Sequence, residues 1–267
     1  MDDQRKRELL ETLTAQLAAE RDAALPNANS VDELWTAFRA LVNTRPPWAA
    51  SEDFLAMQDE LLTGLIDEAG IHVIDDASVS PLDDRLCLWR GDITTLACDA
   101  IVNAANSQML GCWAPGHYCI DNAIHTYAGV QLRIECNRIM QEQGHEEPTG
   151  QAKITPAYNL PSRYVLHTVG PIANGRPTDL HRRQLASSYK SCLDIAAAHD
   201  LDSVAFCCIS TGVFGFPQQE AARIAVNTVR EWLDEHDSTM AVVFNVFSAN
   251  DELIYQSLLG LTNANLV

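Results

Sequence analysis

The chain has 267 residues, of which 47% are hydrophobic and 20% charged, the balance of a globular protein long enough to bury a core without disulfides. Its formal net charge of -18 disfavours nucleic acid as a partner, because such a surface repels phosphates. No apolar run reaches membrane-spanning length and no signal segment is visible, so we expect a cytoplasmic protein with reduced cysteines and no membrane contact.

Residues 1–78 are predicted to form a helical extension. Leucines near the start follow helical spacing. Ser30 is a predicted N-cap, with Glu33 completing a capping box, and Ser51 caps a third helix that Gly70 ends. This stretch carries no catalytic signature, so we expect it to pack on the main domain and not to have a separate function.

Residues 79–267 alternate short apolar runs with longer helical patterns, which is typical of an α/β sandwich with a parallel or mixed sheet. The predicted strands are 86–89, 100–104, 152–157, 164–168, 203–209 and 240–247. The predicted helices lie near 119–143, 178–199, 217–236 and 251–260. In such sheets ligands bind beyond the C-terminal ends of the strands, so the segments that follow strands hold the candidate site residues.

One of these segments, STGVFGFP at 210–217, follows a buried strand and precedes a helix. Its two glycines permit tight turns, and Pro217 suits the first turn of the next helix. A strand, a glycine-bearing loop and a helix start can together bind an anion through backbone N–H groups, although many α/β turns contain glycine without binding anything. The candidate residues are Ser210, Thr211, Gly212, Val213, Phe214 and Gly215.

Asn103 and Asn106 flank two alanines just after the apolar residues 100–102. A side-chain amide both donates and accepts hydrogen bonds, which suits sugar hydroxyls. Asparagine is equally typical of turns, so this segment alone does not choose between ligand binding and turn formation.

The segment GCWAPGHYCID at 111–121 is the strongest metal candidate. Cys112, His117 and Cys119 offer thiolate and imidazole ligands at a short spacing that suits tetrahedral zinc. Three protein ligands would leave a fourth position for water or substrate, as in catalytic sites; a closed structural site would need Cys136 or His125 as well. Chance grouping of these residue types is the competing interpretation.

Asp121 stands at the predicted start of the next helix. It is either a cap or first-turn acid, or a general base that orients a sugar hydroxyl beside the metal. His125 and His167 occupy helix and strand interiors, so we expect them to be structural.

Several segments together resemble the macrodomain family, an ADP-ribose-binding fold. They are GDIT (91–94), DAIVNAAN (99–106), AIHTYAG (123–129), GQAKIT (150–155), YVLHTVGP (164–171) and ISTGVFGFP (209–217). The resemblance covers roughly residues 80 to 260, with these segments in the family's order. The resemblance implies a three-layer α/β/α macrodomain with a mixed sheet, preceded by the N-terminal helical extension.

The run at 111–121 departs from the common family pattern. Hydrolytic macrodomains usually have a shorter glycine-rich run that ends in Asp, whereas here the run is longer and contains Cys112, His117 and Cys119. It looks like the zinc-dependent branch of the family, whose members remove ADP-ribose from modified proteins and also carry a helical N-terminal extension. The resemblance therefore implies Zn²⁺ as the cofactor.

The resemblance also implies how ADP-ribose is bound. Asp92 is expected to hydrogen-bond the adenine amino group, with Ile93 beside it. Residues 210–216 are expected to enclose the pyrophosphate, with Phe214 against the distal ribose. The last strand, ending near Phe247, would form a wall of the adenine pocket.

For the reaction, Asn103 and Asn106 are expected near the distal ribose, and Asp121 matches the acid that ends the usual glycine run. We therefore expect a monomeric hydrolase that uses zinc, Asn106 and Asp121 to remove ADP-ribose from a modified protein side chain. Two alternatives remain. One is a reader that binds ADP-ribose without cleaving it, and the other is a hydrolase of free esters such as O-acetyl-ADP-ribose.

Overall fold

The computed structural model describes residues 1–262 and contains eight α-helices and nine strands within that part of the chain. The helices are α1 (Asp3–Ala19), α2 (Val31–Asn43), α3 (Glu52–Ala69), α4 (Ile120–Ala128), α5 (Val130–Gln143), α6 (Asp179–Ala198), α7 (Gln218–Glu235) and α8 (Ala249–Leu258). The strands are β1 (His72–Val73), β2 (Ser78–Val79), β3 (Leu86–Arg90), β4 (Leu96–Ala97), β5 (Ala100–Ala105), β6 (Ala152–Pro156), β7 (Tyr164–Val169), β8 (Ser203–Phe206) and β9 (Ala241–Val246).

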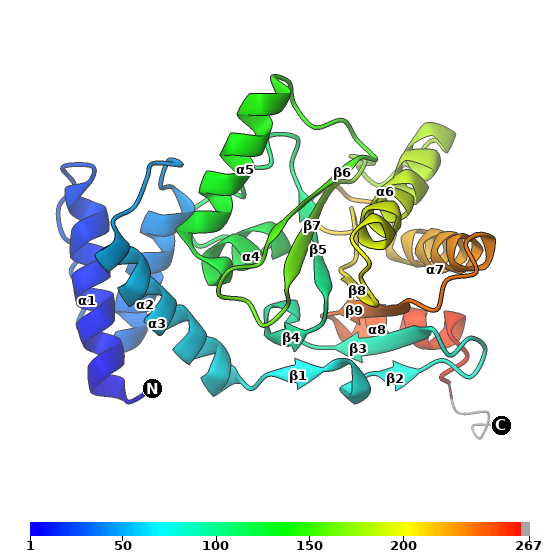
Figure 1. The fold of residues 1–267 in the computed structure, drawn as a ribbon, viewed down its shortest axis with the longest axis horizontal. Coiled ribbons are helices and arrows are strands. Elements are labelled where there is room, and N and C mark those ends of the chain that lie inside the picture. The colour runs from blue at the N-terminus through cyan, green and yellow to red at the C-terminus, as the bar shows by residue number, and fades with distance from the viewer. Residues whose placement is uncertain (263–267) are drawn as a thin grey trace.

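A mixed seven-stranded sheet forms the centre of the molecule, in the order β2-β3-β9-β8-β5-β7-β6. The five inner strands are parallel, and the edge strands β2 and β6 are antiparallel to their neighbours. Helices α4 and α5 cover one face and α6, α7 and α8 the other, which gives three layers (Figure 1). The predicted α/β/α architecture with a mixed sheet is thus confirmed. Because the inner strands are parallel, their C-terminal ends all meet at one edge.

The N-terminal helices begin and end where local chemistry predicts. The Ser30 hydroxyl accepts from the Glu33 N–H at 3.2 Å, and the Ser51 hydroxyl accepts from the Phe54 N–H at 3.2 Å. The Glu33 carboxylate accepts from the backbone N–H of Asn29 at 2.6 Å, so the reciprocal bond of the capping box falls one residue earlier than expected. Gly70 ends α3 with a φ of 89°, a conformation that favours glycine.

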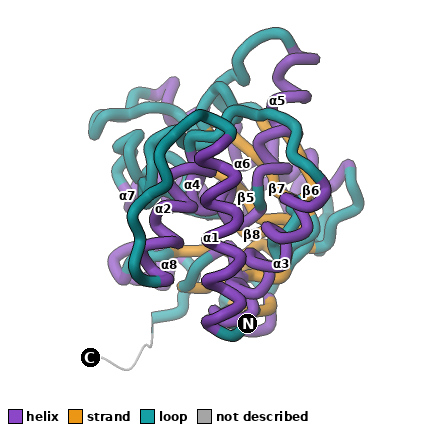
Figure 2. Tube along the Cα trace, turned by 90° about the vertical axis from the view of Figure 1, so that its left-hand side faces the viewer, coloured by secondary structure: helices purple, strands orange, loops and turns teal. Residues whose placement is uncertain are grey.

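The helical extension has its own apolar cluster and lies against the rest of the protein (Figure 2). The cluster is built from α1, α2 and α3, and it also includes Val130 and Ile134 of α5. A larger cluster fills the space between the sheet and its helices. The boundary at residue 78 stays a prediction. Among the described residues, no helix combines the length and apolarity that crossing a membrane requires.

Three local predictions were wrong. The expected helix over 119–143 is two helices, because Gly129 breaks it at a φ of 95°, where an added Cβ would lie 2.5 Å from the Gln58 amide. The expected strand 203–209 ends at Phe206, since the chain there turns into the loop that follows. The strands β1, β2 and β4 were missed because two residues are too short to show an alternating pattern.

Candidate functional site

Three predicted residues meet at the C-terminal end of β5. The Asn103 amide donates to the Asp121 carboxylate at 2.8 Å, and the Asn106 amide approaches its second oxygen at 3.4 Å. Asp121 lies in the first turn of α4 and is 5% exposed. Burial raises the pKa of its carboxyl to about 6, although the Asn103 hydrogen bond and the charge of Arg133 act in the opposite direction.

A buried network extends behind Asp121. The Asn103 amide also donates to His167 Nδ1 at 3.1 Å, which leaves the proton on Nε2 to be donated to the Thr155 hydroxyl at 3.0 Å. Burial lowers the pKa of His167 to about 3, so the ring is neutral. His167 was expected to be structural, and it is linked to Asp121 through the amide of Asn103.

His125, which the sequence offered only as a structural residue or a further metal ligand, is a neighbour of Asp121. Its Nε2 lies 3.6 Å from an Asp121 oxygen, and burial lowers the pKa of its ring well below the usual value. Neither ring nitrogen has a hydrogen-bond partner among the described residues. The signal was present in the sequence, because residues four apart on a helix share a face.

The predicted metal ligands lie on the metal loop, which we define as residues 111–119. The ligand atoms of Cys112, His117 and Cys119 all lie within 4.8 Å of one another, and Cys112 Sγ is 3.5 Å from His117 Nδ1. The bond lengths of tetrahedral zinc place a sulfur and a nitrogen ligand about 3.6 Å apart. The donor set and its geometry therefore fit such an ion.

A second group of ligand-type side chains lies deeper. His125, Cys136 and His167 also bring their ligand atoms within 4.8 Å of one another, and all three are buried. Both nitrogens of His167 are already in hydrogen bonds, to Asn103 and Thr155. Burial raises the pKa of the Cys136 thiol, as it does that of Cys119 in the metal loop, so thiol pKa does not distinguish the two groups and the occupied His167 nitrogens do. The metal loop is the better metal candidate of the two.

The glycine loop, residues 210–216, joins β8 to α7, and its backbone has unpaired donors. The N–H groups of Gly212, Val213 and Phe214 donate to no acceptor among the described residues. Gly215 has a φ of 64° and Ser210 a φ of 66°, so the chain turns sharply at both ends of the loop. Free N–H groups just before a helix start are the donors that the predicted anion site would require.

Asp92 and Ile93 follow β3, which is separated from β5 by the strands β9 and β8. The exposed Asp92 carboxylate accepts from the backbone N–H and the hydroxyl of Thr94, at 3.0 and 2.7 Å. These bonds fix the carboxylate at the surface, while the Ile93 side chain is buried. Phe247 lies just after the neighbouring strand β9 and is 82% exposed, so its ring is free to cover a ligand.

A cleft of about 390 Å³ opens between Phe214 and the segment that follows α5. Its wall includes Glu146 and Glu147, which the sequence analysis did not single out. Glu147 forms an ion pair with Lys153 at 3.0 Å, whereas the Glu146 carboxylate accepts from the Ser107 hydroxyl at 2.9 Å. Nothing in the local sequence signals these acids, because only the return of the chain after α5 brings them to the cleft.

Several known proteins are similar to this chain over most of its length. The Macro domain family model matches residues 102–225. A protein-ADP-ribose hydrolase of Treponema medium is 57% identical over 233 residues, covering 86% of this chain and 88% of the relative. A Trypanosoma brucei macrodomain crystallised with ADP-ribose is similar at a TM-score of 0.65 and 32% identity, covering 83% of this chain and 95% of that one. An Oceanobacillus iheyensis macrodomain with ADP has a TM-score of 0.60 and 41% identity, covering 66% of this chain and 90% of its own.

Proposed function

We propose that this chain, which belongs to the macro domain family, is a protein-ADP-ribose hydrolase whose active site holds zinc on the metal loop. The relatives support the activity, since those from Treponema medium and Staphylococcus aureus are named protein-ADP-ribose hydrolases and are 57% and 50% identical. The Trypanosoma brucei macrodomain in complex with ADP-ribose supports the ligand.

One observation carries the zinc part of the proposal. The loop that bears Cys112, His117 and Cys119 runs directly into Asp121, whose carboxylate is held by Asn103 and lies 3.4 Å from the amide of Asn106. The charge of Asp121 acts on the Cys119 thiol, so we infer that a metal bound by the three ligands lies near this buried carboxylate. A reader module, which only binds ADP-ribose, does not need such reactive groups.

The binding residues divide the ligand among them. Asp92 accepts a hydrogen bond from the adenine amino group, with Ile93 beside the ring. Residues 210–216 surround the pyrophosphate, where free N–H groups donate to its oxygens. Phe214 packs against the distal ribose, next to the cleft.

The reacting end of the ligand lies at Asn106 and Asp121. Asn106 holds a hydroxyl of the distal ribose, and Asn103 acts on the same sugar indirectly, because its amide orients Asp121. Asp121 accepts the proton of a water molecule whose oxygen bonds to C1″ while the bond from C1″ to the protein side chain breaks. A bound zinc ion would supply a Lewis acid at this position.

The decisive experiment measures turnover of ADP-ribosylated protein together with bound metal. We expect Cys119→Ala to lose both zinc and turnover, with a fall in rate of about a thousandfold, since a metal contributes several kcal/mol to the transition state. Cys136→Ala, in the deeper group of side chains, is the matched control and should keep both. Turnover at the wild-type rate by zinc-free Cys119→Ala would show that the metal only supports the loop.

The two rival functions give different outcomes in the same assays. A reader would bind ADP-ribose and release none from modified protein. A free-ester hydrolase would cleave O-acetyl-ADP-ribose but leave the modified protein intact. Turnover should fall in acid, because the ligands hold the metal only in their deprotonated forms. A chelator should abolish turnover, because it removes the metal.

We further propose that the protein works as a monomer in the cytoplasm and that its partner is an ADP-ribosylated protein. Its cysteines are free, which agrees with a reducing compartment. The net charge of -18 supports the prediction that neither nucleic acid nor a membrane is a partner.

A further inference from the structure

The metal loop has little regular structure of its own. It contains neither helix nor strand, and the single backbone hydrogen bond within residues 111–119 joins the N–H of His117 to the carbonyl of Ala114 at 3.2 Å. The positions of its three ligands therefore depend on contacts from other parts of the protein. Many of those contacts come from the helical extension.

The first contact is a buried amide on the last residue of α2. Asn43 Oδ1 accepts from the backbone N–H of Gly116 at 3.0 Å, directly before the ligand His117. The Nδ2 atom of Asn43 donates to the Thr126 hydroxyl of α4 at 2.9 Å. Asn43 is thus fixed at both ends of its amide and connects the middle of the metal loop to α4.

A second contact lies one helical turn earlier on α2. The Arg39 guanidinium donates to the Asn122 side chain at 3.0 Å, and the Asn122 amide donates to the carbonyl of Ala114 at 3.3 Å. The same guanidinium lies over the ring of Tyr118, 5.2 Å from its centroid. Tyr118 separates the ligands His117 and Cys119, so this part of the loop is also held from α2.

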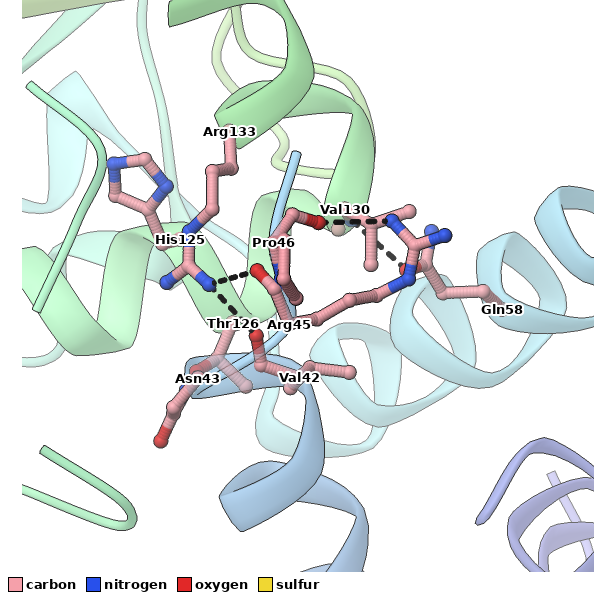
Figure 3. Close-up of a pocket in the computed structure, with 10 residues that line it drawn as sticks. Val42, Asn43, Arg45, Pro46, Gln58, His125, Thr126, Val130 and Arg133 are labelled. Atoms are coloured by element: carbon pink, nitrogen blue, oxygen red, sulfur yellow. Dashed lines mark hydrogen bonds between the residues drawn. The ribbon is translucent and has the colours of Figure 1, made fainter. Parts of the chain in front are cut away.

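A third contact joins the C-terminal end of α2 to the start of the loop through Arg133 of α5. The Arg133 guanidinium donates to the carbonyls of Val42 and Arg45, at 3.1 and 2.7 Å, as Figure 3 shows. It also donates to the carbonyl of Leu110 at 2.6 Å and lies 4.3 Å from the ring centroid of Trp113. The residues on either side of Cys112 are therefore tied to the extension.

We propose that α2 of the helical extension positions the metal loop, and that Asn43 holds the backbone before His117 in the conformation that binds the metal. The inference rests on the proposed function, in which Cys112, His117 and Cys119 bind zinc. Residues that orient metal ligands change metal affinity by about 10- to 100-fold when they are replaced. Asn43 is a positioning residue in this sense, since it touches neither metal nor substrate.

The chain provides a matched control for this role in Gln58 of α3. Its Oε1 accepts from the Val130 N–H at 2.9 Å, and its Nε2 donates to Gln131 at 2.8 Å. Like Asn43, it is a buried amide that joins the extension to the main domain. It contacts α5 and not the metal loop, so its loss tests docking of the extension without touching the loop.

The experiment uses full-length Asn43→Ala, Asn43→Asp and Gln58→Ala. Zinc affinity is measured by competition with a chromogenic chelator, and hydrogen exchange of residues 111–119 is measured in the metal-free protein. Asn43→Ala should weaken zinc binding about tenfold and accelerate exchange in the loop. Asn43→Asp, which still accepts from Gly116, should restore most of both. Gln58→Ala should lower thermal stability but leave zinc affinity and loop exchange at wild-type values.

Wild-type zinc affinity and loop exchange in Asn43→Ala would overturn the inference. An equal loss in Gln58→Ala would also overturn it, because the effect would then come from general loosening of the extension. A wild-type protein that binds no zinc would contradict the proposed function instead. Hydrogen exchange in the metal-free variants would still decide whether α2 holds the loop.

Discussion

The metal loop and the glycine loop both follow inner strands of the same sheet, but they are built in opposite ways. The metal loop presents side chains, and side chains of α2 and α5 hold it in place. The glycine loop presents backbone N–H groups and is held by backbone bonds, from the Ala173 N–H to the Phe214 carbonyl at 2.8 Å and from the Gly175 N–H to the Gly215 carbonyl at 2.7 Å.

The difference separates two tasks. Side-chain identity decides whether a metal and a carboxylate are available, so in the proposed function the metal loop sets the chemistry. Backbone conformation decides whether N–H groups converge on an anion, so in the proposed function the glycine loop sets the affinity for ADP-ribose. Substitutions at the metal loop should therefore lower turnover and leave ADP-ribose affinity unchanged. Substitutions in the glycine loop should lower the affinity and leave zinc binding unchanged.

The largest expected effect comes from Asp121→Asn, beside the metal loop. The amide keeps the size of the side chain but cannot accept a proton, so we expect kcat to fall about a thousandfold, within the range of general bases. Zinc content and the Kd for ADP-ribose should stay at wild-type values, as measured by metal analysis and calorimetry. A large loss of ADP-ribose affinity would break the separation of tasks.

A smaller effect, on ADP-ribose affinity and not on zinc binding, is expected from Gly215→Ala in the glycine loop. Residue 215 has a φ of 64°, and an added Cβ would lie 3.2 Å from the Gly175 nitrogen. This left-handed conformation costs a residue with a side chain roughly 1–2 kcal/mol, so we expect the free loop to relax out of it. Binding would then have to restore the conformation, and ADP-ribose should bind about tenfold more weakly. Zinc content should not change.

The matched control for this change is Gly144→Ala at the end of α5. Gly144 has a φ of 75°, and an added Cβ there would meet nothing within 4 Å. It should lose comparable stability and keep its affinity for ADP-ribose. If both variants bind ADP-ribose equally well in calorimetry, the conformation of the glycine loop does not control affinity.

The smallest effect concerns pH and the network behind Asp121. Burial lowers the pKa of His167 to about 3 from its ordinary value of 6.5, so the unfolded chain takes up the proton first. His167 therefore removes stability as pH falls below 6.5, by less than about 1 kcal/mol between pH 7 and pH 6. His167→Gln should flatten this slope in urea denaturation. An unchanged slope would assign the acid sensitivity to other groups.

Local chemistry made much of the fold predictable. The caps at Ser30 and Ser51 and the apolar runs of the inner strands depend on neighbours within a few residues, and their elements form where they were expected. The metal-ligand prediction has the same origin, because Cys112, His117 and Cys119 are close along the chain. A short loop is enough to bring their ligand atoms within 4.8 Å of one another.

Prediction was weaker where distant segments decide the outcome. The expected helix divides at Gly129, where φ is 95° and an added Cβ would meet the Gln58 side chain of α3. Glu146 reaches the cleft only through the turn after α5. Neither arrangement leaves a periodic or spacing signal in the neighbouring residues.

The sequence by itself determined the α/β class and the residue types at each strand end, and it predicted the candidate ligands of the metal loop, since all three depend on short-range patterns. The tertiary structure alone decided what holds that loop. Asn43 and Gly116 are 73 positions apart, and Arg133 lies 91 positions after Val42. Contacts over such separations form only when whole helices pack, which is why a helical extension without a catalytic signature becomes part of the site's support.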